Sequence, residues 1–281
     1  MSIRNNQERL GAMHPDSGDV PQGQTKSPLD YISPTELVDL PSKGKYYHPN
    51  HPLHNKDTVE IRLMTAKDED ILTSQSLLKK GVALDRFIDG IIKEKGVNSS
   101  NLLVGDKNAI LIAARVSGYG PEYNAKVTCP SCGANNKHEF YLDDIKPKEK
   151  EIDESMISMT DRGTFITRLP FCDMDAEFRL LYGSDESKIA AKLLNKRKDQ
   201  QESISTDQIK LFIVSVGGVE DREVLNRFVN SMPARDSRHL RKAYRMINPD
   251  IDLKTAFSCS QCGHEQEMEV PLSADFFWPD S

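Results

Sequence analysis

The chain lacks several features that would place it in a specialised class. No apolar run approaches the length of about 20 residues that a membrane-spanning helix needs. The opening stretch, MSIRNNQERLGAMHPDSGDV, has no apolar segment of the kind found in secretory signals. The net charge is -6, so the chain has no overall basic excess of the kind that nucleic-acid-binding proteins carry. We therefore expect a protein that stays in the cytosol.

Signatures of catalysis are also missing. The stretch "GYGPEY" lacks the third glycine of a dinucleotide-binding loop, and the chain has no Gly-x-x-x-x-Gly-Lys. Asp68, Glu69 and Asp70 resemble a catalytic acid cluster, but acidic residues also favour the first turn of a helix. No nucleophile has an evident base near it in the sequence. We expect a protein that is not an enzyme.

Cysteine is scarce, and its spacing carries the strongest signal. Of the five cysteines, four form two Cys-x-x-Cys-Gly motifs, at Cys129 and Cys132 and at Cys259 and Cys262. In the cytosol such cysteines bind metal more often than they form disulfides. Each motif is typical of a zinc knuckle, and two knuckles together supply the four thiolates of a closed structural site. The sequence predicts one zinc ion bound by all four, with an iron–sulfur cluster as the alternative.

Two other cysteine and histidine patterns are weaker. A thioredoxin-like dithiol should open a helix, whereas Gly133 and polar residues follow Cys132 and lead into a predicted strand. The remaining cysteine, Cys172, has no partner in the sequence and is expected to be a small buried side chain. Three histidines are spaced three residues apart, but the prolines between them disfavour a helix, so we expect a surface loop containing His48, His51 and His54.

The two cysteine motifs belong to longer stretches that align without a gap. Cys129 falls on Cys259 and Gly133 on Gly263, and upstream Arg115 falls on Arg245. Farther back, "VEIRLMTAKDEDI" resembles "AEFRLLYGSDESKI". We interpret the chain as an α+β protein made by tandem duplication, each unit ending in a knuckle hairpin and the two knuckles sharing one four-cysteine site. The units should superpose about an approximate two-fold axis near the metal.

The predicted organisation has three parts. Residues 1–28 are polar and form a disordered tail. Residues 29–145 form the first repeat, and residues 146–281 contain a charged linker and the second repeat.

Local patterns predict the elements of the first repeat. Apolar and polar residues alternate in a strand over 59–63, and Thr65 and Asp68 have the spacing of a capping box that opens a helix. A later helix should be capped by Asp106 and end at Gly118 and Gly120.

The carboxy-terminal stretch "DFFWP" concentrates Phe276, Phe277 and Trp278, the only tryptophan. These rings either fold back onto the core or dock into a partner, because aromatic anchors dominate interface energetics.

Four stretches show a resemblance to a known family. "LPSKGKYYHP", "RLMTAKDEDIL", "LLVGDKNAILIAARVSGYGPEY" and "VPLSADFFWP" are similar to the T-even-type bacteriophage baseplate hub subunit family, and the similarity runs from about Leu40 onward. The resemblance implies a non-enzymatic hub component or assembly factor that acts with other hub and tail proteins and with the tape measure. It would work in the host cytoplasm during assembly or in the virion tail. The alternatives are a zinc-ribbon nucleic-acid-binding or transcription factor and a dithiol redox protein.

Overall fold

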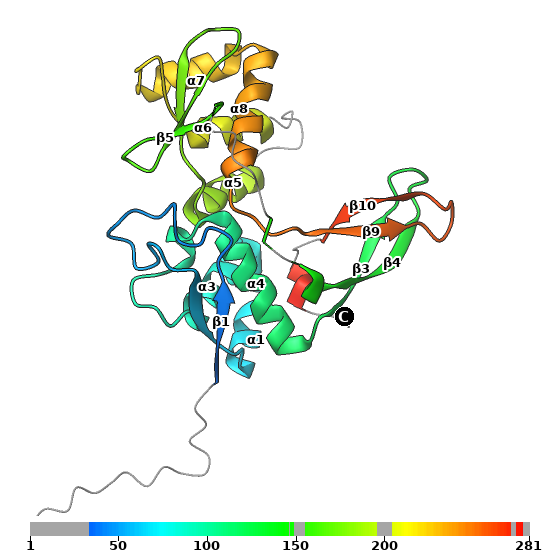
Figure 1. The fold of residues 1–281 in the computed structure, drawn as a ribbon. Coiled ribbons are helices and arrows are strands. Elements are labelled where there is room, and N and C mark those ends of the chain that lie inside the picture. The colour runs from blue at the N-terminus through cyan, green and yellow to red at the C-terminus, as the bar shows by residue number, and fades with distance from the viewer. Residues whose placement is uncertain (1–33, 146, 149–154, 196–203, 271–273, 278–281) are drawn as a thin grey trace, which may run out of the picture. The chain divides into compact units, whose positions relative to one another are not determined.

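The chain repeats one succession of elements (Figure 1). The computed structural model describes residues 34–145, 147–148, 155–195, 204–270 and 274–277, and Pro34–Ser281 form one compact unit. The tail predicted over residues 1–28 lies outside the described residues. The first repeat contains β1 (Thr35–Asp39), β2 (Thr58–Arg62), α1 (Ala66–Thr73), α2 (Gln75–Lys80), α3 (Ala83–Ile91), α4 (Val104–Tyr119), β3 (Glu122–Thr128) and β4 (Asn135–Tyr141).

The second repeat follows the same order with small additions. It contains β5 (Ser158–Met159), β6 (Phe165–Arg168), β7 (Asp175–Phe178), α5 (Gly183–Asn195), α6 (Ile204–Phe212), β8 (Ile213–Val216), α7 (Arg222–Ser231), α8 (Ala234–Ile247), β9 (Lys254–Ser258) and β10 (Glu265–Glu269). Short 3-10 turns occur at η2 (Ser99–Asn101), η3 (Leu142–Asp144) and η4 (Ala274–Phe277).

Four antiparallel sheets fit this duplication. β1 pairs with β2 and β3 with β4 in the first repeat, and β9 pairs with β10 in the second. The pair β6–β7 corresponds to β1–β2 and lies inside a sheet of order β5-β6-β7-β8. After β1 and after β6 the chain makes a Leu-Pro turn, and the leucines Leu40 and Leu169 are both buried. The predicted α+β duplication is therefore the architecture of the chain.

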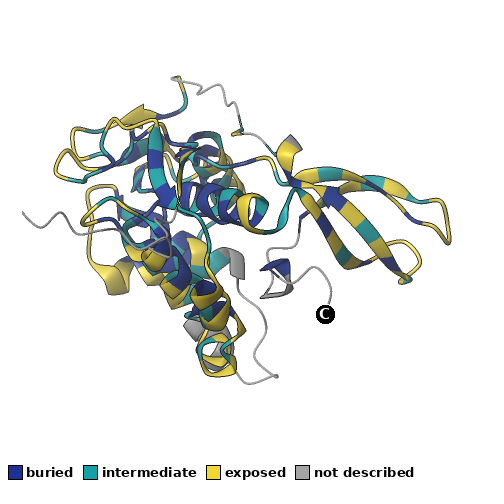
Figure 2. Cartoon of the chain, turned by 90° about the horizontal axis from the view of Figure 1, so that it is seen from below, coloured by how far each residue is buried: buried dark blue, intermediate teal, exposed yellow. Residues whose placement is uncertain are grey.

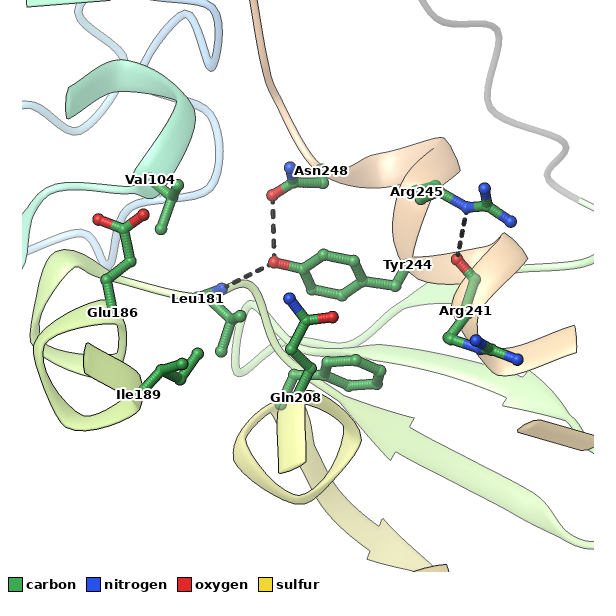
Figure 3. Close-up of a pocket in the computed structure, with 10 residues that line it drawn as sticks. Val104, Leu181, Glu186, Ile189, Gln208, Arg241, Tyr244, Arg245 and Asn248 are labelled. Carbon is green, nitrogen blue, oxygen red and sulfur yellow. Dashed lines mark hydrogen bonds between the residues drawn. The ribbon is translucent and has the colours of Figure 1, made fainter. Parts of the chain in front are cut away.

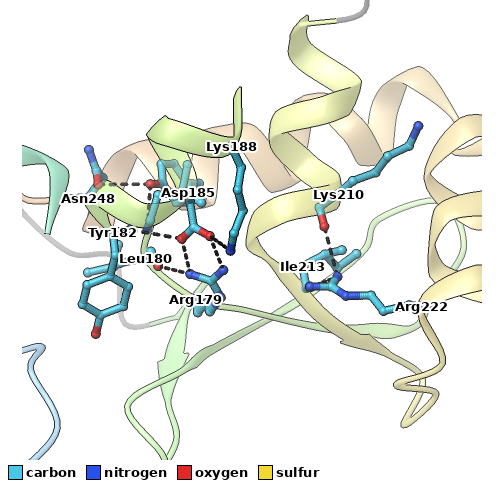
Figure 4. Close-up of polar contacts among 11 residues, drawn as sticks. Arg179, Leu180, Tyr182, Asp185, Lys188, Lys210, Ile213, Arg222 and Asn248 are labelled. Atoms are coloured by element: carbon cyan, nitrogen blue, oxygen red, sulfur yellow. Dashed lines mark hydrogen bonds and ion pairs between the residues drawn. The ribbon is translucent and has the colours of Figure 1, made fainter. Parts of the chain in front are cut away.

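An arginine–aspartate pair closes the loop after the second strand of each repeat. Arg62 donates to both carboxylate oxygens of Asp68, at 2.6 and 2.8 Å, and the N–H of Thr65 donates to the same carboxylate. Arg179 and Asp185 repeat this arrangement at 2.7 and 3.0 Å (Figure 4). The predicted capping box of Thr65 and Asp68 is confirmed. Identical polar contacts in two diverged sequences are strong evidence of duplication.

A second aspartate pair is buried at the start of α4 and α8. Asp106 accepts hydrogen bonds from the backbone N–H and the hydroxyl of Ser42 at 2.9 and 2.6 Å, and from the Tyr47 hydroxyl at 2.7 Å. The prediction that Asp106 caps the helix is wrong, because α4 already begins at Val104. The carboxylate instead holds the Leu-Pro turn that follows β1.

The equivalent carboxylate in the second repeat holds the corresponding Leu-Pro turn. Asp236 accepts hydrogen bonds from the backbone N–H groups of Phe171 and Cys172, at 2.7 and 3.0 Å, in the Leu-Pro turn after β6. Both aspartates are fully buried, so each repeat fastens its first hairpin to its long helix through one carboxylate.

Two glycines allow the repeats to approach closely. A Cβ on Gly105, in the first turn of α4, would lie 2.0 Å from the Pro249 carbonyl oxygen of the second repeat. A Cβ on Gly183, at the start of α5, would lie 2.0 Å from the Ser99 carbonyl oxygen of the first repeat. The Gly183 N–H also donates to the Leu102 carbonyl at 2.9 Å. Figure 2 shows the buried residues of the helices, with α4 largely enclosed. One core runs through both repeats.

Candidate metal centre

Each cysteine pair lies at the turn of a hairpin, as the sequence predicts. In the β3–β4 hairpin the N–H of Cys129 donates to the Ala134 carbonyl at 2.8 Å, and the N–H of Gly133 donates back to the Cys129 carbonyl at 2.8 Å. Gly133 has φ +71°, a left-handed conformation that glycine adopts without strain. The turn therefore directs both cysteine side chains to the same side.

The β9–β10 hairpin reproduces this turn. The N–H of Cys259 donates to the His264 carbonyl at 2.9 Å, the N–H of Gly263 donates to the Cys259 carbonyl at 3.0 Å, and Gly263 has φ +67°. A strand follows each pair, not a helix, so neither motif has the geometry of a thioredoxin dithiol.

The two hairpins lie side by side (Figure 1) and bring all four sulfurs together. Cys129 Sγ lies 3.7 Å from Cys262 Sγ, and Cys132 Sγ lies 3.7 Å from Cys259 Sγ. All four sulfurs lie within 4.8 Å of one another. Four thiolates about 2.3 Å from a central zinc ion would stand about 3.8 Å apart at the corners of a tetrahedron. A disulfide would need about 2.05 Å, so the arrangement suits a shared ion and not a covalent bond.

The electrostatics of the thiols also favour a cation. The backbone N–H groups of Cys262 and Gln261 lower the pKa of Cys259 to about 6, so this thiol ionises readily. The Ala134 N–H lowers the pKa of Cys132. The surrounding sulfurs, above all that of Cys262, have the larger combined effect and raise this pKa to about 12. The Cys132 thiol therefore resists ionisation beside the other sulfurs, and a dication at the centre of the cluster would remove that resistance.

Asn136 joins the two hairpins beside the sulfurs, and sequence reasoning did not identify it. Its side-chain carbonyl accepts hydrogen bonds from the Ser260 N–H at 3.1 Å and the Ser260 hydroxyl at 2.7 Å, and its amide nitrogen lies 3.5 Å from Cys259 Sγ. The side chain is buried. Polar groups of this kind orient metal ligands and tune their basicity. The only available signal was its position, four residues beyond Cys132 on the strand that leaves the turn.

The other candidate ligands do not converge. His51 stacks on Tyr47 with ring centroids 4.3 Å apart, and His54 Nδ1 lies 2.7 Å from the Tyr47 carbonyl oxygen, while His48 is exposed. Cys172 is half-buried in the Leu-Pro turn of the second repeat. Within the described residues, the four cysteines are the only cluster of histidine, cysteine or carboxylate ligands with metal-binding geometry.

The carboxy-terminal phenylalanines lie in the core. Phe276 packs edge-on against Tyr123 at 5.1 Å, Phe277 packs against Phe87 at 5.2 Å, and both are at most 2% exposed. Arg115 in α4 donates to the Phe276 carbonyl at 2.8 Å. The interpretation of these two rings as partner anchors does not fit this placement, because they present almost no surface to another protein. Trp278 lies outside the described residues.

A family model described as "T4 bacteriophage base plate protein" matches residues 33–278. The chain belongs to this base plate family. A search of curated proteins and a search of solved structures each found no match. Among the described residues of this base plate protein, no helix combines the length and the apolar character that crossing a membrane requires.

Proposed function

We propose that this base plate protein is a non-enzymatic structural or assembly component of the central hub of a contractile phage tail. Membership of the base plate family supports the role in the tail, and the resemblance to hub subunits narrows it to the hub. Its partners would be other hub and tail proteins, the tape measure among them. It would act in the host cytoplasm during assembly and could be retained in the virion tail.

The observation that carries the mechanism is the four-cysteine cluster shared by the two repeats. We infer that Cys129, Cys132, Cys259 and Cys262 hold one zinc ion. Two sulfur pairs lie 3.7 Å apart and all four sulfurs lie within 4.8 Å of one another, which fits a single ion at their centre. These separations are too short for a four-iron cluster, in which each thiolate binds a different iron. Four protein thiolates leave no open coordination position for water or a substrate, so the site is structural and clamps the repeats together.

Such a clamp would contribute much of the stability of the chain. A structural zinc site contributes on the order of 10 kcal/mol, which is comparable to the whole free energy of unfolding of a domain. The second knuckle leads directly into the segment that contains Phe276 and Phe277, and Arg115 of the first repeat holds that segment. Loss of the metal should therefore loosen the repeats and release this segment.

Complementation of a phage that lacks the gene tests this proposal, with Cys259→Ser compared with Cys172→Ser as a matched control. Cys259→Ser should leave incomplete hubs in electron micrographs of tail intermediates, because the hub protein loses its rigid form. Cys172→Ser should support normal tails. Normal baseplates followed by a failure after adsorption would contradict the assembly role of the clamp.

A further inference from the structure

Five basic side chains occupy one side of α8. At 3.6 residues per turn they span about 120° of the helix circumference. The buried residues Leu240, Ala243 and Ile247 lie on the opposite side. We call this set the α8 basic face, and it comprises Arg235, Arg238, Arg241, Lys242 and Arg245.

The cations of this face have no carboxylate partners among the described residues. The ion pairs of the described chain involve other arginines and lysines. The only carboxylate of α8, that of Asp236, is buried and binds the turn after β6. Like charges three and four residues apart destabilise a helix, whereas an ordinary solvated face mixes both signs. Five positive charges on one helix face, in a chain with net charge -6, therefore indicate a binding role.

The duplication shows how the same side of the helix is used in the first repeat. The residues of α4 aligned with Arg241, Lys242 and Arg245 are Leu111, Ile112 and Arg115, and all three are buried. Arg115 there binds the carbonyl of Phe276, so the chain itself covers that side of α4. In the second repeat this side carries charge, and Arg238, Lys242 and Arg245 are exposed.

A pocket opens beside the α8 basic face (Figure 3). Its volume is about 430 Å³, within the range of ligand pockets. Its walls are apolar on one side, where Val104, Leu181, Ile189 and Phe212 lie, and the remaining lining residues are mostly polar or charged. Phe212 stacks on Tyr244 with ring centroids 4.6 Å apart. The Tyr244 hydroxyl is already occupied, because it accepts from the Leu181 N–H at 3.3 Å and donates to Asn248 at 3.2 Å.

Among the described residues that line the pocket, positive charges outnumber negative ones. Arg241 and Arg245 lie at one side of it, and within the described part of the chain each uses only its Nε, in a bond to a carbonyl of its own helix. The acid at the other side, Glu186, is paired with Lys107 at 3.1 Å. An apolar group that enters the pocket would therefore have free guanidinium groups next to it.

From these observations we propose that the α8 basic face and its pocket bind an acidic segment of a partner protein. Carboxylates of that segment would pair with the arginines, and one large apolar side chain would fill the pocket. Guanidinium groups pair with carboxylates through two parallel hydrogen bonds, which gives such docking its orientation. That the partner is a protein follows from the proposed assembly role, on which this inference rests. A nucleic acid fits less well, because the chain has a net charge of -6 and the apolar part of the pocket offers nothing to phosphates.

Binding of synthetic peptides to the full zinc-loaded chain tests the inference, with fluorescence anisotropy as the readout. The probes are fluorescein-labelled Glu-Glu-Glu-Phe-Glu-Glu-Glu and the same peptide with alanine at the centre. The phenylalanine peptide should bind about tenfold more tightly than the alanine peptide, since tenfold corresponds to about 1.4 kcal/mol, a typical value for one buried side chain. Gln208→Trp, at the exposed rim of the pocket, should abolish that difference.

Charge-reversal variants test the electrostatic part. Arg241→Glu/Arg245→Glu should weaken binding of the phenylalanine peptide at least tenfold. Arg238→Glu/Lys242→Glu should also weaken this binding, because both positions are exposed on the same face. The matched control is Lys79→Glu/Lys80→Glu in α2, which changes the net charge equally and should have little effect.

Three results would overturn the proposal: equal binding of both peptides, equal weakening by the control, or tighter binding of a mixed-sequence DNA duplex than of the phenylalanine peptide. Because none of these variants touches a cysteine, zinc content stays as in the wild type. A negative result in these binding experiments would therefore not contradict the zinc clamp or the assembly role.

Discussion

Replacing Arg115 with methionine should detach the carboxy-terminal turn η4 from the first repeat. The guanidinium group of Arg115 is buried and donates to three backbone carbonyls, those of Phe276 at 2.8 Å, Gly120 at 2.8 Å and Glu122 at 3.0 Å. Methionine keeps most of the apolar volume of the arginine stem but makes none of these bonds. The substitution therefore removes the three hydrogen bonds together with the contact of the guanidinium group over the Tyr119 ring, 5.1 Å from its centroid.

The expected cost follows from what each carbonyl loses. Phe276 is buried, so its carbonyl would be left without a partner, at a cost of about 1–3 kcal/mol. Glu122 is exposed and Gly120 is half-buried, so water can replace those two bonds, and each loss costs about 0.5–1.5 kcal/mol. We expect the free energy of unfolding to fall by about 4 kcal/mol in total.

The duplicated chain provides its own control. Arg245 occupies the aligned position in α8 and is exposed. Its one hydrogen bond to another described residue runs from Nε to the Arg241 carbonyl of the same helix, at 3.4 Å. Arg245→Met should therefore change the free energy of unfolding by about 0.5 kcal/mol or less. Urea unfolding followed by circular dichroism, with zinc present throughout, compares the two variants. A difference of less than about 1 kcal/mol between them would refute the claim that Arg115 anchors the carboxy-terminal segment.

Three further predictions concern other parts of the structure. Gly105→Ala should destabilise the chain by about 3 kcal/mol or more, because its Cβ would collide with a carbonyl of the second repeat, whereas Gly90→Ala has room and should be neutral or slightly stabilising in urea unfolding. Cys172→Ser should leave the zinc content unchanged in elemental analysis, and a loss of metal would contradict the four-ligand assignment. Burial alone would raise the pKa of Asp68, but the hydrogen bonds of its arginine partner lower it below the usual 3.8. The ionised Asp68 carboxylate therefore stabilises the folded chain fully above about pH 4, and this stabilisation is lost as the pH falls through the lowered pKa. The difference in free energy of unfolding between wild type and Asp68→Asn should accordingly become smaller in acid. A constant difference between about pH 5 and pH 2 would count against this pairing.

Features encoded in short stretches were predictable from the sequence. The capping box of Thr65 and Asp68 depends on residues three apart, and the end of α4 at Gly120 depends on one left-handed glycine. The four-cysteine cluster was predictable although its halves are far apart, because each half has its own local motif and the two motifs match.

Features that depend on long-range partners were not predictable. Asp106 resembles a helix cap in sequence, but its partner Ser42 lies 64 residues away and only folding brings them together. The burial of Arg115 depends on Phe276, at a separation of 161 residues. Asn136 resembles an ordinary polar strand residue until the second hairpin packs against it. In each case the side chain is polar, so its burial could not be inferred from hydrophobic pattern.

X-ray absorption at the zinc edge of the purified full-length protein tests most directly the claim that one metal ion joins the two repeats. The edge height gives the metal content, and the fine structure gives the number and type of ligand atoms. We expect one zinc per chain with four sulfur ligands at about 2.3 Å. Two metal ions per chain, or a first shell that contains nitrogen or oxygen in place of any of the four sulfurs, would contradict that claim.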